Sequence, residues 1–193
     1  MHKLKIYRLL FVIPLLFVGC GSGDSGPDNV VKKVTKPASG KFTIDGVPPG
    51  QAGTEGTDNP PHYNILLKLY PKGRAVTKDD LFPTAKVDPT TGKYEFATYN
   101  AGDGIPAGDY IITFESLNQA PIGRYLMGPD RFKNNFNNPV SQDPKYSVKV
   151  DEASKGDVAM PNIDIKMSEL TDQEPSSFAT PEGAAGSRRG SGR

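Results

Sequence analysis

The chain has 193 residues, of which 36% are hydrophobic, and it contains 21 glycines, 18 prolines and no tryptophan. This length suits one ordinary domain with additional terminal segments, and the glycine and proline content predicts many turns. The formal net charge is +1 at pH 7, so the chain lacks the strongly basic surface that nucleic-acid binding requires. We therefore expect no nucleic-acid partner.

A secretory signal is predicted at the N-terminus. Its basic region carries Lys3, Lys5 and Arg8, and residues 9–18 form an almost unbroken apolar run. A run of about ten apolar residues is typical of a signal peptide and is too short to span a bilayer as a helix. Removing residues 1–19 takes three of the 23 Lys and Arg residues and none of the 22 Asp and Glu residues, which leaves a net charge of 20 − 22 = −2.

The predicted signal ends at Phe17-Val18-Gly19-Cys20. This segment resembles the lipobox of bacterial lipoproteins, in which a small residue precedes a cysteine that receives diacylglycerol; Phe17 stands where the motif usually has leucine. A lone cysteine in an exported protein has no intramolecular partner, so we interpret Cys20 as the lipid anchor. The alternative is a free thiol at an ordinary cleavage site. Lipid attachment places the protein in the cell envelope, on the outer membrane or the periplasmic face.

The composition predicts flexible segments on both sides of the domain. Residues 20–37 are small and polar and end at a proline, which predicts a flexible tether between the lipid and the domain. The domain is predicted to cover residues 38–168. Residues 169–193 carry too little apolar surface to order themselves, so we expect a disordered, solvated tail.

Apolar residues alternate with a period of two in several short runs, which predicts β-strands. The expected strands are residues 40–44, 63–70, 85–87, 93–99, 110–114, 146–150 and 162–167. The residues expected to supply most of the core are Phe42, Ile44, Ile65, Leu67, Leu69, Tyr94, Phe96, Ile112, Phe114, Val148, Val150, Ile163 and Ile165. Asp88-Pro89-Thr90-Thr91-Gly92 has the composition of a tight turn between two of these strands. We predict an all-β fold, a single antiparallel Greek-key β-sandwich of about seven strands.

A glycine-rich segment separates residues 93–99 from residues 110–114. The candidate turn and corner residues are Gly102, Asp103, Gly104, Pro106, Gly108 and Tyr110. We expect the Asp103 carboxylate to accept hydrogen bonds from nearby backbone N–H groups. A phosphate cradle is the alternative, but the helix and the Lys-Ser/Thr pair of a P-loop do not follow. Tyr110 resembles a tyrosine corner, and we expect its hydroxyl to bond a backbone group of this loop.

Three other segments lie between the predicted strands. The loop from Gly50 to His62 is longer than compact domains usually contain, so we expect it to be mobile or functional. Residues 77–82 form either one helical turn capped by Thr77 or a loop. The run from Asn134 to Asn138 lies in a stretch rich in Asn, Pro and Gly, and its composition indicates no role.

Few residues offer catalytic or metal-binding chemistry. The only histidines are His2, which is lost with the signal, and His62, so we expect no zinc or copper site. The sequence has no G-x-S-x-G nucleophile elbow. Asp79, Asp80 and Asp88 lack the spacing of a calcium-binding EF-hand, and we interpret them as a solvated acidic face.

Arg131 is the remaining candidate for recognition of a ligand. We expect its guanidinium to pair with an internal acid such as Asp130 or Asp143, and recognition of an external carboxylate is the alternative. We therefore predict no catalytic residue, no cofactor and no metal.

Residues 39–48, Gly102-Asp103-Gly104 with the following Pro106-Ala107-Gly108-Asp109-Tyr110, and residues 130–132 and 146–150 together resemble predicted lipoproteins of planctomycete-type bacteria. Those proteins are commonly described as similar to the carboxypeptidase regulatory-like, transthyretin-like β-sandwich, an Ig-like architecture. The resemblance covers about residues 38–167 and implies that fold. The family has no well-defined activity, so the resemblance implies none.

Three functions remain. The one that we favour is a non-enzymatic, lipid-anchored envelope module that binds a protein or a surface polymer such as a polysaccharide, or that has a structural role. The second is a carbohydrate-binding module, for which Tyr63, Tyr70 and Tyr99 have to share one exposed face because tryptophan is absent. The third is a hydrolase similar to the transthyretin-related hydroxyisourate enzymes. The chain lacks their active-site histidines, and only Arg189-Gly190-Ser191 matches part of their terminal motif.

Overall fold

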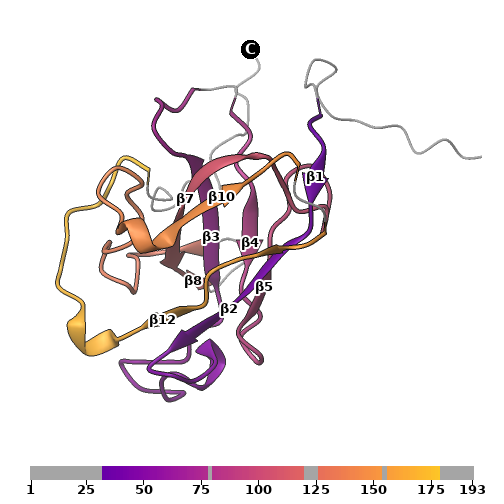
Figure 1. Ribbon diagram of the computed structural model, residues 1–193. Coiled ribbons are helices and arrows are strands. Elements are labelled where there is room, and N and C mark those ends of the chain that lie inside the picture. The colour runs from indigo at the N-terminus through magenta and orange to yellow at the C-terminus, as the bar shows by residue number, and fades with distance from the viewer. Residues whose placement is uncertain (1–31, 78–79, 120–125, 154–155, 179–193) are drawn as a thin grey trace, which may run out of the picture. The chain divides into compact units, whose positions relative to one another are not determined.

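The computed structural model describes residues 32–77, 80–119, 126–153 and 156–178. All of them belong to the second of the two units into which the chain divides, Lys32–Arg193. Within these residues the secondary structure consists of β-strands and three short 3-10 helices, without an α-helix (Figure 1). The predicted all-β class is therefore confirmed. No helix in this part of the chain has the length and apolar character needed to cross a membrane.

One four-stranded sheet has the strand order β10-β7-β3-β4. Its strands are β10 (Ser147–Val150), β7 (Gly108–Ser116), β3 (Ile65–Pro71) and β4 (Thr84–Lys86). All neighbouring pairs in this sheet are antiparallel, and β3 and β7 form the longest pairing, from Ile65↔Ser116 to Pro71↔Tyr110. These two strands lie at the centre of the sheet in Figure 1.

The second sheet is built around β2 (Ala38–Ile44). On one side β2 pairs antiparallel with β5 (Lys93–Glu95), and on the other it pairs parallel with β11 (Val158–Ala159) and β12 (Ile163–Ile165). The expectation of an entirely antiparallel fold is therefore wrong for β2. A period of two identifies a strand but not the direction of its partner, and these partners come from the far end of the sequence.

The shorter elements lie mostly in the connections. β1 (Thr35–Lys36) pairs with β6 (Ile105–Pro106), and β8 (Asn118–Gln119) pairs with β9 (Leu126–Met127). The 3-10 helices are η1 (Pro49–Gln51), η2 (Pro144–Tyr146) and η3 (Met167–Glu169). Because β1 lies within residues 20–37, the last residues of the predicted tether belong to the folded unit.

The turn predicted between residues 85–87 and 93–99 is present. The Asp88 carboxylate accepts hydrogen bonds from the backbone N–H groups of Thr90 and Thr91, and Gly92 adopts a φ of 73°. Val87 and Tyr94 pair across the turn as an isolated bridge. This hairpin connects the two sheets, because β4 belongs to one of them and β5 to the other.

The core lies where side chains of the two sheets meet. The ring of Phe42 on β2 contacts the ring of Phe114 on β7 edge to face, with centroids 5.4 Å apart. Phe132 from the loop after β9 packs on both rings. Every residue that the sequence predicts for the core is buried except Val148, which is half-buried.

β7 differs from the other strands because both of its faces are buried. Ile112 and Phe114 were expected to face the core, and the alternate residues Ile111 and Thr113 are also only 4% exposed. A strand at the centre of a sheet is buried on both faces only when another part of the chain covers the face opposite the core. The covering segments create the hollow described next.

Candidate functional site

A groove of about 530 Å³ lies over the face of β3, β4 and β7 that points away from the core. Its floor follows from strand alternation: Leu66 lies between Glu115 of β7 and Lys86 of β4, and in the next row Lys68 pairs with Thr113. Ile65, Leu67 and Leu69 point to the opposite side and are buried. The sequence analysis predicted the buried face of β3 and assigned no role to this one.

The walls of the groove come from four other segments. Next to β4, the wall contains Glu95 together with Ala101 and Gly102 of the corner loop, which we define as residues 98–108. A Cβ atom added to Gly102 would lie 3.6 Å from Oε1 of Glu95, so this glycine lies against the carboxylate. Next to β7, the wall contains Asn137, and near Tyr70 it is formed by Phe178.

The charged side chains of the groove balance in sign. Lys68 and Lys86 oppose Glu95 and Glu115. The ammonium group of Lys68 also lies over the ring of Tyr70, 5.6 Å from its centroid, in a cation–π contact. The groove therefore offers donors and acceptors without an excess of either charge.

The aromatic wall depends on the strap, which we define as residues 170–178. Phe178 at the end of the strap contacts the ring of Tyr70 edge to face at 5.5 Å, and Tyr70 also packs on Phe82 at 4.7 Å. Tyr70 is only 4% exposed. The prediction of a disordered tail is thus wrong for the strap, because apolar content alone does not show what polar contacts hold a segment.

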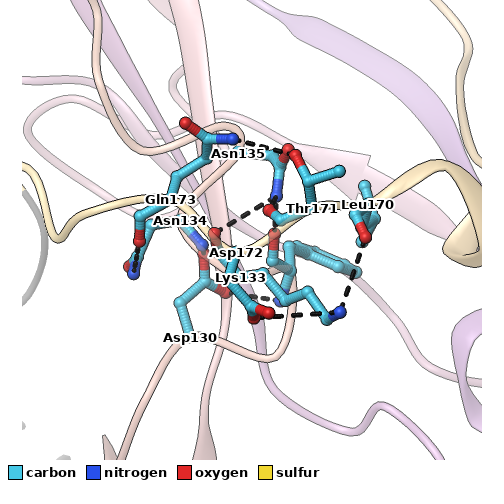
Figure 2. Close-up of polar contacts among 9 residues, drawn as sticks. Asp130, Lys133, Asn134, Asn135, Leu170, Thr171, Asp172 and Gln173 are labelled. Atoms are coloured by element: carbon cyan, nitrogen blue, oxygen red, sulfur yellow. Dashed lines mark hydrogen bonds and ion pairs between the residues drawn. The ribbon is translucent and has the colours of Figure 1, made fainter.

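The strap is held by the Asn-rich segment, which we define as residues 130–138 (Figure 2). Nδ2 of Asn135 donates to the carbonyl oxygen of Thr171 at 2.7 Å, and Nδ2 of Asn134 donates to that of Gln173 at 2.9 Å. The backbone N–H of Gln173 donates in return to the carbonyl oxygen of Lys133 at 3.1 Å. The asparagine run therefore latches the strap, a role that the sequence alone did not indicate.

The same bonds orient Asn137. Because the amide nitrogen of Asn134 is bonded to Gln173, its oxygen faces Asn137 and accepts from Nδ2 of Asn137 at 2.9 Å. The orientation of the Asn137 amide is thereby fixed, and its Oδ1 has no hydrogen-bond partner among the described residues. Asn137 is 3% exposed and lines the groove. The groove thus has a buried, unpaired acceptor in its lining.

Asp130 organises the Asn-rich segment. Its carboxylate accepts hydrogen bonds from the backbone N–H groups of Ser116, Phe132 and Asn134 at 2.8, 3.0 and 3.2 Å. These bonds support the left-handed backbone of Lys133 and Asn134, whose φ angles are 55° and 59°. Burial raises the pKa of Asp130 to about 6, although the hydrogen bonds from Ser116 and Phe132 act in the opposite direction.

His62 is a histidine to which the sequence analysis assigned no role. It is 1% exposed, its Nδ1 lies 2.7 Å from Oγ of Ser116 in a hydrogen bond, and its ring stacks on Phe132 with centroids 5.4 Å apart. Burial, together with the charge of Arg131, lowers its pKa to about 4. His62 is thus a neutral side chain inside the core, which attaches the end of the 50–62 loop.

This histidine, serine and aspartate do not have the geometry of a catalytic triad. In a triad the imidazole connects an accessible nucleophile to the carboxylate. Here Ser116 is fully buried, and Asp130 accepts from the backbone of Ser116 while no described residue partners Nε2 of His62. The group packs the core and presents no nucleophile to the groove.

Arg131 does not pair with Asp130 or Asp143, so that prediction is wrong. Its guanidinium donates to the carbonyl oxygens of Pro60 and Pro61 and to Oδ1 of Asn59. The acceptors are two backbone carbonyl groups and one side-chain amide of a loop 70–72 positions away, which a search for acidic partners overlooks. With His62, Arg131 attaches the 50–62 loop that was expected to be mobile or functional.

The corner loop has the contacts expected from the sequence. The Asp103 carboxylate accepts from the backbone N–H groups of Thr98, Tyr99 and Asn100 at 2.7, 3.0 and 2.9 Å. The Tyr110 hydroxyl donates to the carbonyl oxygen of Pro106 at 3.1 Å. Together they fix the path of the chain from β5 of the second sheet to β7 of the first.

A close approach of two backbones explains one glycine of this loop. A Cβ at Gly104 would lie 1.8 Å from the carbonyl oxygen of Lys36, and the residue has a φ of 84°. Only glycine fits a position where β1 crosses so near. Pro106 belongs to β6, next to that crossing.

The other candidates do not assemble into a site. Tyr70 is buried while Tyr63 is 46% exposed, so the platform of exposed tyrosines considered for carbohydrate binding does not form. Asp80 bonds Arg74 at 2.5 Å and Asp88 belongs to its turn, so these carboxylates are used within the fold. Cys20 and Asp79 lie outside the described residues.

The described ranges contain no group of three or more His, Cys, Asp or Glu residues placed to hold a metal ion. No protein-family model, curated protein or solved structure matches the chain.

Proposed function

We propose that this protein is a non-enzymatic, lipid-anchored module of a bacterial cell envelope. Cys20 carries the lipid, the residues that follow it form the tether, and the folded unit, which begins at Lys32, is displayed beyond it. The observation that carries the proposal is the position of the only cysteine, directly after a basic region and an apolar run of signal length. The role of the displayed unit is binding or structural, and its binding face is the groove over β3, β4 and β7.

The fold that we assign to the displayed unit is a Greek-key β-sandwich of the transthyretin-like kind. Two arrangements support it. The sheets around β7 and β2 meet through Phe42 and Phe114, and the hairpin from β4 to β5 passes from one sheet to the other. A two-layer arrangement of this kind buries one face of each sheet.

The non-enzymatic part of the proposal is supported by the chemistry of the groove. Its charged side chains are two lysines and two glutamates, while the neighbouring histidine and serine are enclosed in the core. A hydrolytic mechanism requires a nucleophile and a base that a substrate can reach. His62 and Ser116 do not offer that, and the hydroxyisourate hydrolase alternative has no residue set to rely on.

The anchor is tested by Cys20→Ser in the full-length chain, expressed in a bacterial host fed with a clickable fatty acid. We expect wild-type protein to be labelled and to sediment with membranes, and the variant to lose the label and enter the soluble fraction. Two or three acyl chains hold a protein on a membrane stably, whereas one chain holds only marginally.

The chain offers a matched control for thiol chemistry. Cys20→Ser combined with Ser22→Cys restores a cysteine two positions further on, outside the lipobox, and we expect it to remain unlabelled. Labelling of this double variant would show nonspecific acylation of a thiol. An exported wild-type protein that is soluble and unlabelled would overturn the proposal.

A further inference from the structure

We propose that the groove over β3, β4 and β7 binds a short, neutral oligosaccharide. This inference names the ligand class for the binding face and rests on the proposed role of the protein as a displayed envelope module. The groove has a volume of about 530 Å³, inside the range of roughly 300–1,000 Å³ that is usual for ligand sites. Its floor is a rigid pair of central strands, β3 and β7.

The balance of charge in the groove selects against ions. An anionic ligand that reached Lys68 and Lys86 would also face the negative charges of the two glutamates, Glu95 and Glu115. A cationic ligand that reached these glutamates would likewise be repelled by the two lysines. A hydroxyl group both donates and accepts, so a sugar can bond ammonium and carboxylate groups at the same time. Among the described residues, Lys86 and Glu95 have no side-chain hydrogen bond or ion pair, and both are exposed at the rim.

The apolar part of the groove suits the C–H face of a sugar ring. Phe178 and Tyr70 form an edge-to-face pair at one end, and the aliphatic side chain of Leu66 lies between the charged residues of the floor. Ligand sites are commonly apolar surfaces with a few placed polar groups. A pyranose ring matches such a surface, because its C–H faces can pack on the apolar side chains while the hydroxyl groups around the ring bond the polar ones.

The unpaired oxygen of Asn137 points independently to a ligand that donates hydrogen bonds. The bonds from Gln173 through Asn134 hold the amide so that Oδ1 is the atom left without a partner. Buried acceptors are almost always paired, so an unpaired one next to a ligand-sized groove indicates a missing donor. The atom itself is buried, and the residue that carries it lines the groove.

The strap therefore completes the site. Its carbonyl at Gln173 sets the orientation of Asn134 and, through it, of Asn137, while Phe178 supplies the aromatic wall. The latch in Figure 2 is thus part of the construction of the groove. Loss of the latch is expected to weaken binding although none of the residues that form it lines the groove, namely Lys133, Asn134, Asn135, Thr171 and Gln173.

The test uses the full-length protein in detergent and defined neutral, amino-substituted and acidic oligosaccharides, with binding measured by calorimetry. We expect neutral oligosaccharides to bind, and Glu95→Gln and Lys86→Gln each to raise the Kd by about tenfold, which is typical of losing a hydrogen bond to a charged group. Lys93→Gln is the matched control, because Lys93 lies on the same strand as Glu95 but does not line the groove, and its Kd is expected to stay unchanged.

Asn137→Ser separates binding from folding. If circular dichroism shows the wild-type spectrum and the Kd for the neutral oligosaccharide rises, Asn137 acts in binding. Preferential binding of acidic or amino-substituted sugars, equal affinity of all the groove variants, or no heat of binding at millimolar concentration would each overturn the inference. Fatty-acid labelling of Cys20 is measured separately, so failure of sugar binding with intact labelling leaves the anchored module standing.

Discussion

Two carboxylates in this protein perform the same local task in opposite surroundings. Asp103 in the corner loop and Asp130 in the Asn-rich segment each accept hydrogen bonds from three backbone N–H groups. Asp103 is half-buried and its donors are its own neighbours in sequence. Asp130 is 8% exposed, and one of its donors, Ser116, lies on β7.

The pKa values of the two groups move in opposite directions. Burial opposes ionisation at both sites, but at Asp103 the N–H groups of Thr98, Asn100 and Tyr99 outweigh it and lower the pKa. At Asp130 burial is the larger effect, and the pKa rises to about 6. The comparison teaches that three hydrogen bonds stabilise a carboxylate charge at a surface and do not compensate for its removal from water.

The largest expected difference is in stability when each carboxyl group is removed. At pH 5, Asp130→Ala is expected to lower the free energy of unfolding by about 3–5 kcal/mol, because it leaves buried N–H groups without an acceptor. Asp103→Ala is expected to cost only about 1–2 kcal/mol, since its donors can reach water. Urea unfolding followed by circular dichroism measures both. Equal losses would show that burial does not distinguish the two sites.

The second prediction concerns how the ionisation of the buried Asp130 makes stability depend on pH. Its folded pKa of about 6 is above the ordinary 3.8, so its contribution to stability is full below pH 3.8 and is lost as the pH rises through 6. His62 acts in the other direction: its pKa falls from 6.5 to about 4, so its contribution is present above pH 6.5 and is lost as the pH falls towards 4. Each effect is roughly 3 kcal/mol in size and the two nearly cancel in wild type.

Single variants should remove that cancellation. Relative to wild type, Asp130→Asn is expected to lose roughly 3 kcal/mol of stability between pH 6.5 and pH 4, and His62→Gln to gain about as much over the same interval. The quantity measured is the difference in unfolding free energy between variant and wild type at each pH, which removes the titration of the surface carboxylates. Flat differences for both variants would contradict the opposite burial effects. The neighbouring charges that act on the two groups, Glu115 on Asp130 and Arg131 on His62, are unchanged in both variants.

The smallest expected effect concerns the tyrosine that closes the corner loop. Tyr110→Phe removes the hydrogen bond to Pro106 and is expected to cost about 1–3 kcal/mol, because the carbonyl is left unsatisfied beside a buried ring. Tyr63→Phe is the control, since its hydroxyl bonds Glu55 at the exposed surface, and is expected to cost about 0–1 kcal/mol. Unchanged stability with altered sugar binding would assign Tyr110 to a binding surface instead.

The same contrast explains what the sequence could predict. The corner loop was predictable because Asp103, its donors and Tyr110 lie within thirteen positions of one another, from Thr98 to Tyr110, and local turn chemistry depends on neighbours. The strands and the core residues followed from a period of two. The direction of β12 and the roles of His62 and Asp130 were not predictable, because each depends on a segment far away in the chain.

The groove was beyond prediction for the same reason. Its floor residues Lys68, Thr113 and Lys86 alternate with core residues and are indistinguishable from any solvated strand face. Only the pairing register of the sheet and the position of the strap show that they form one surface. Repeated asparagines are compatible with hydrogen bonds from side-chain amides to backbone carbonyl groups, but the sequence does not show which backbone segment they bond.

The pairing of β2 with β12 has a consequence for how the chain is made. The Thr43 hydroxyl bonds the Asp164 carboxylate across 121 positions. One edge of β2, the first long strand, therefore stays unpaired at this end until β12, the last strand, has been made. Contacts this distant in sequence slow folding and leave an open strand edge while they are unformed. In a chain exported as proposed above, β2 lacks its β12 partner until residues 163–165 have crossed the membrane. The domain therefore completes its fold only after the segment that forms β12 is available.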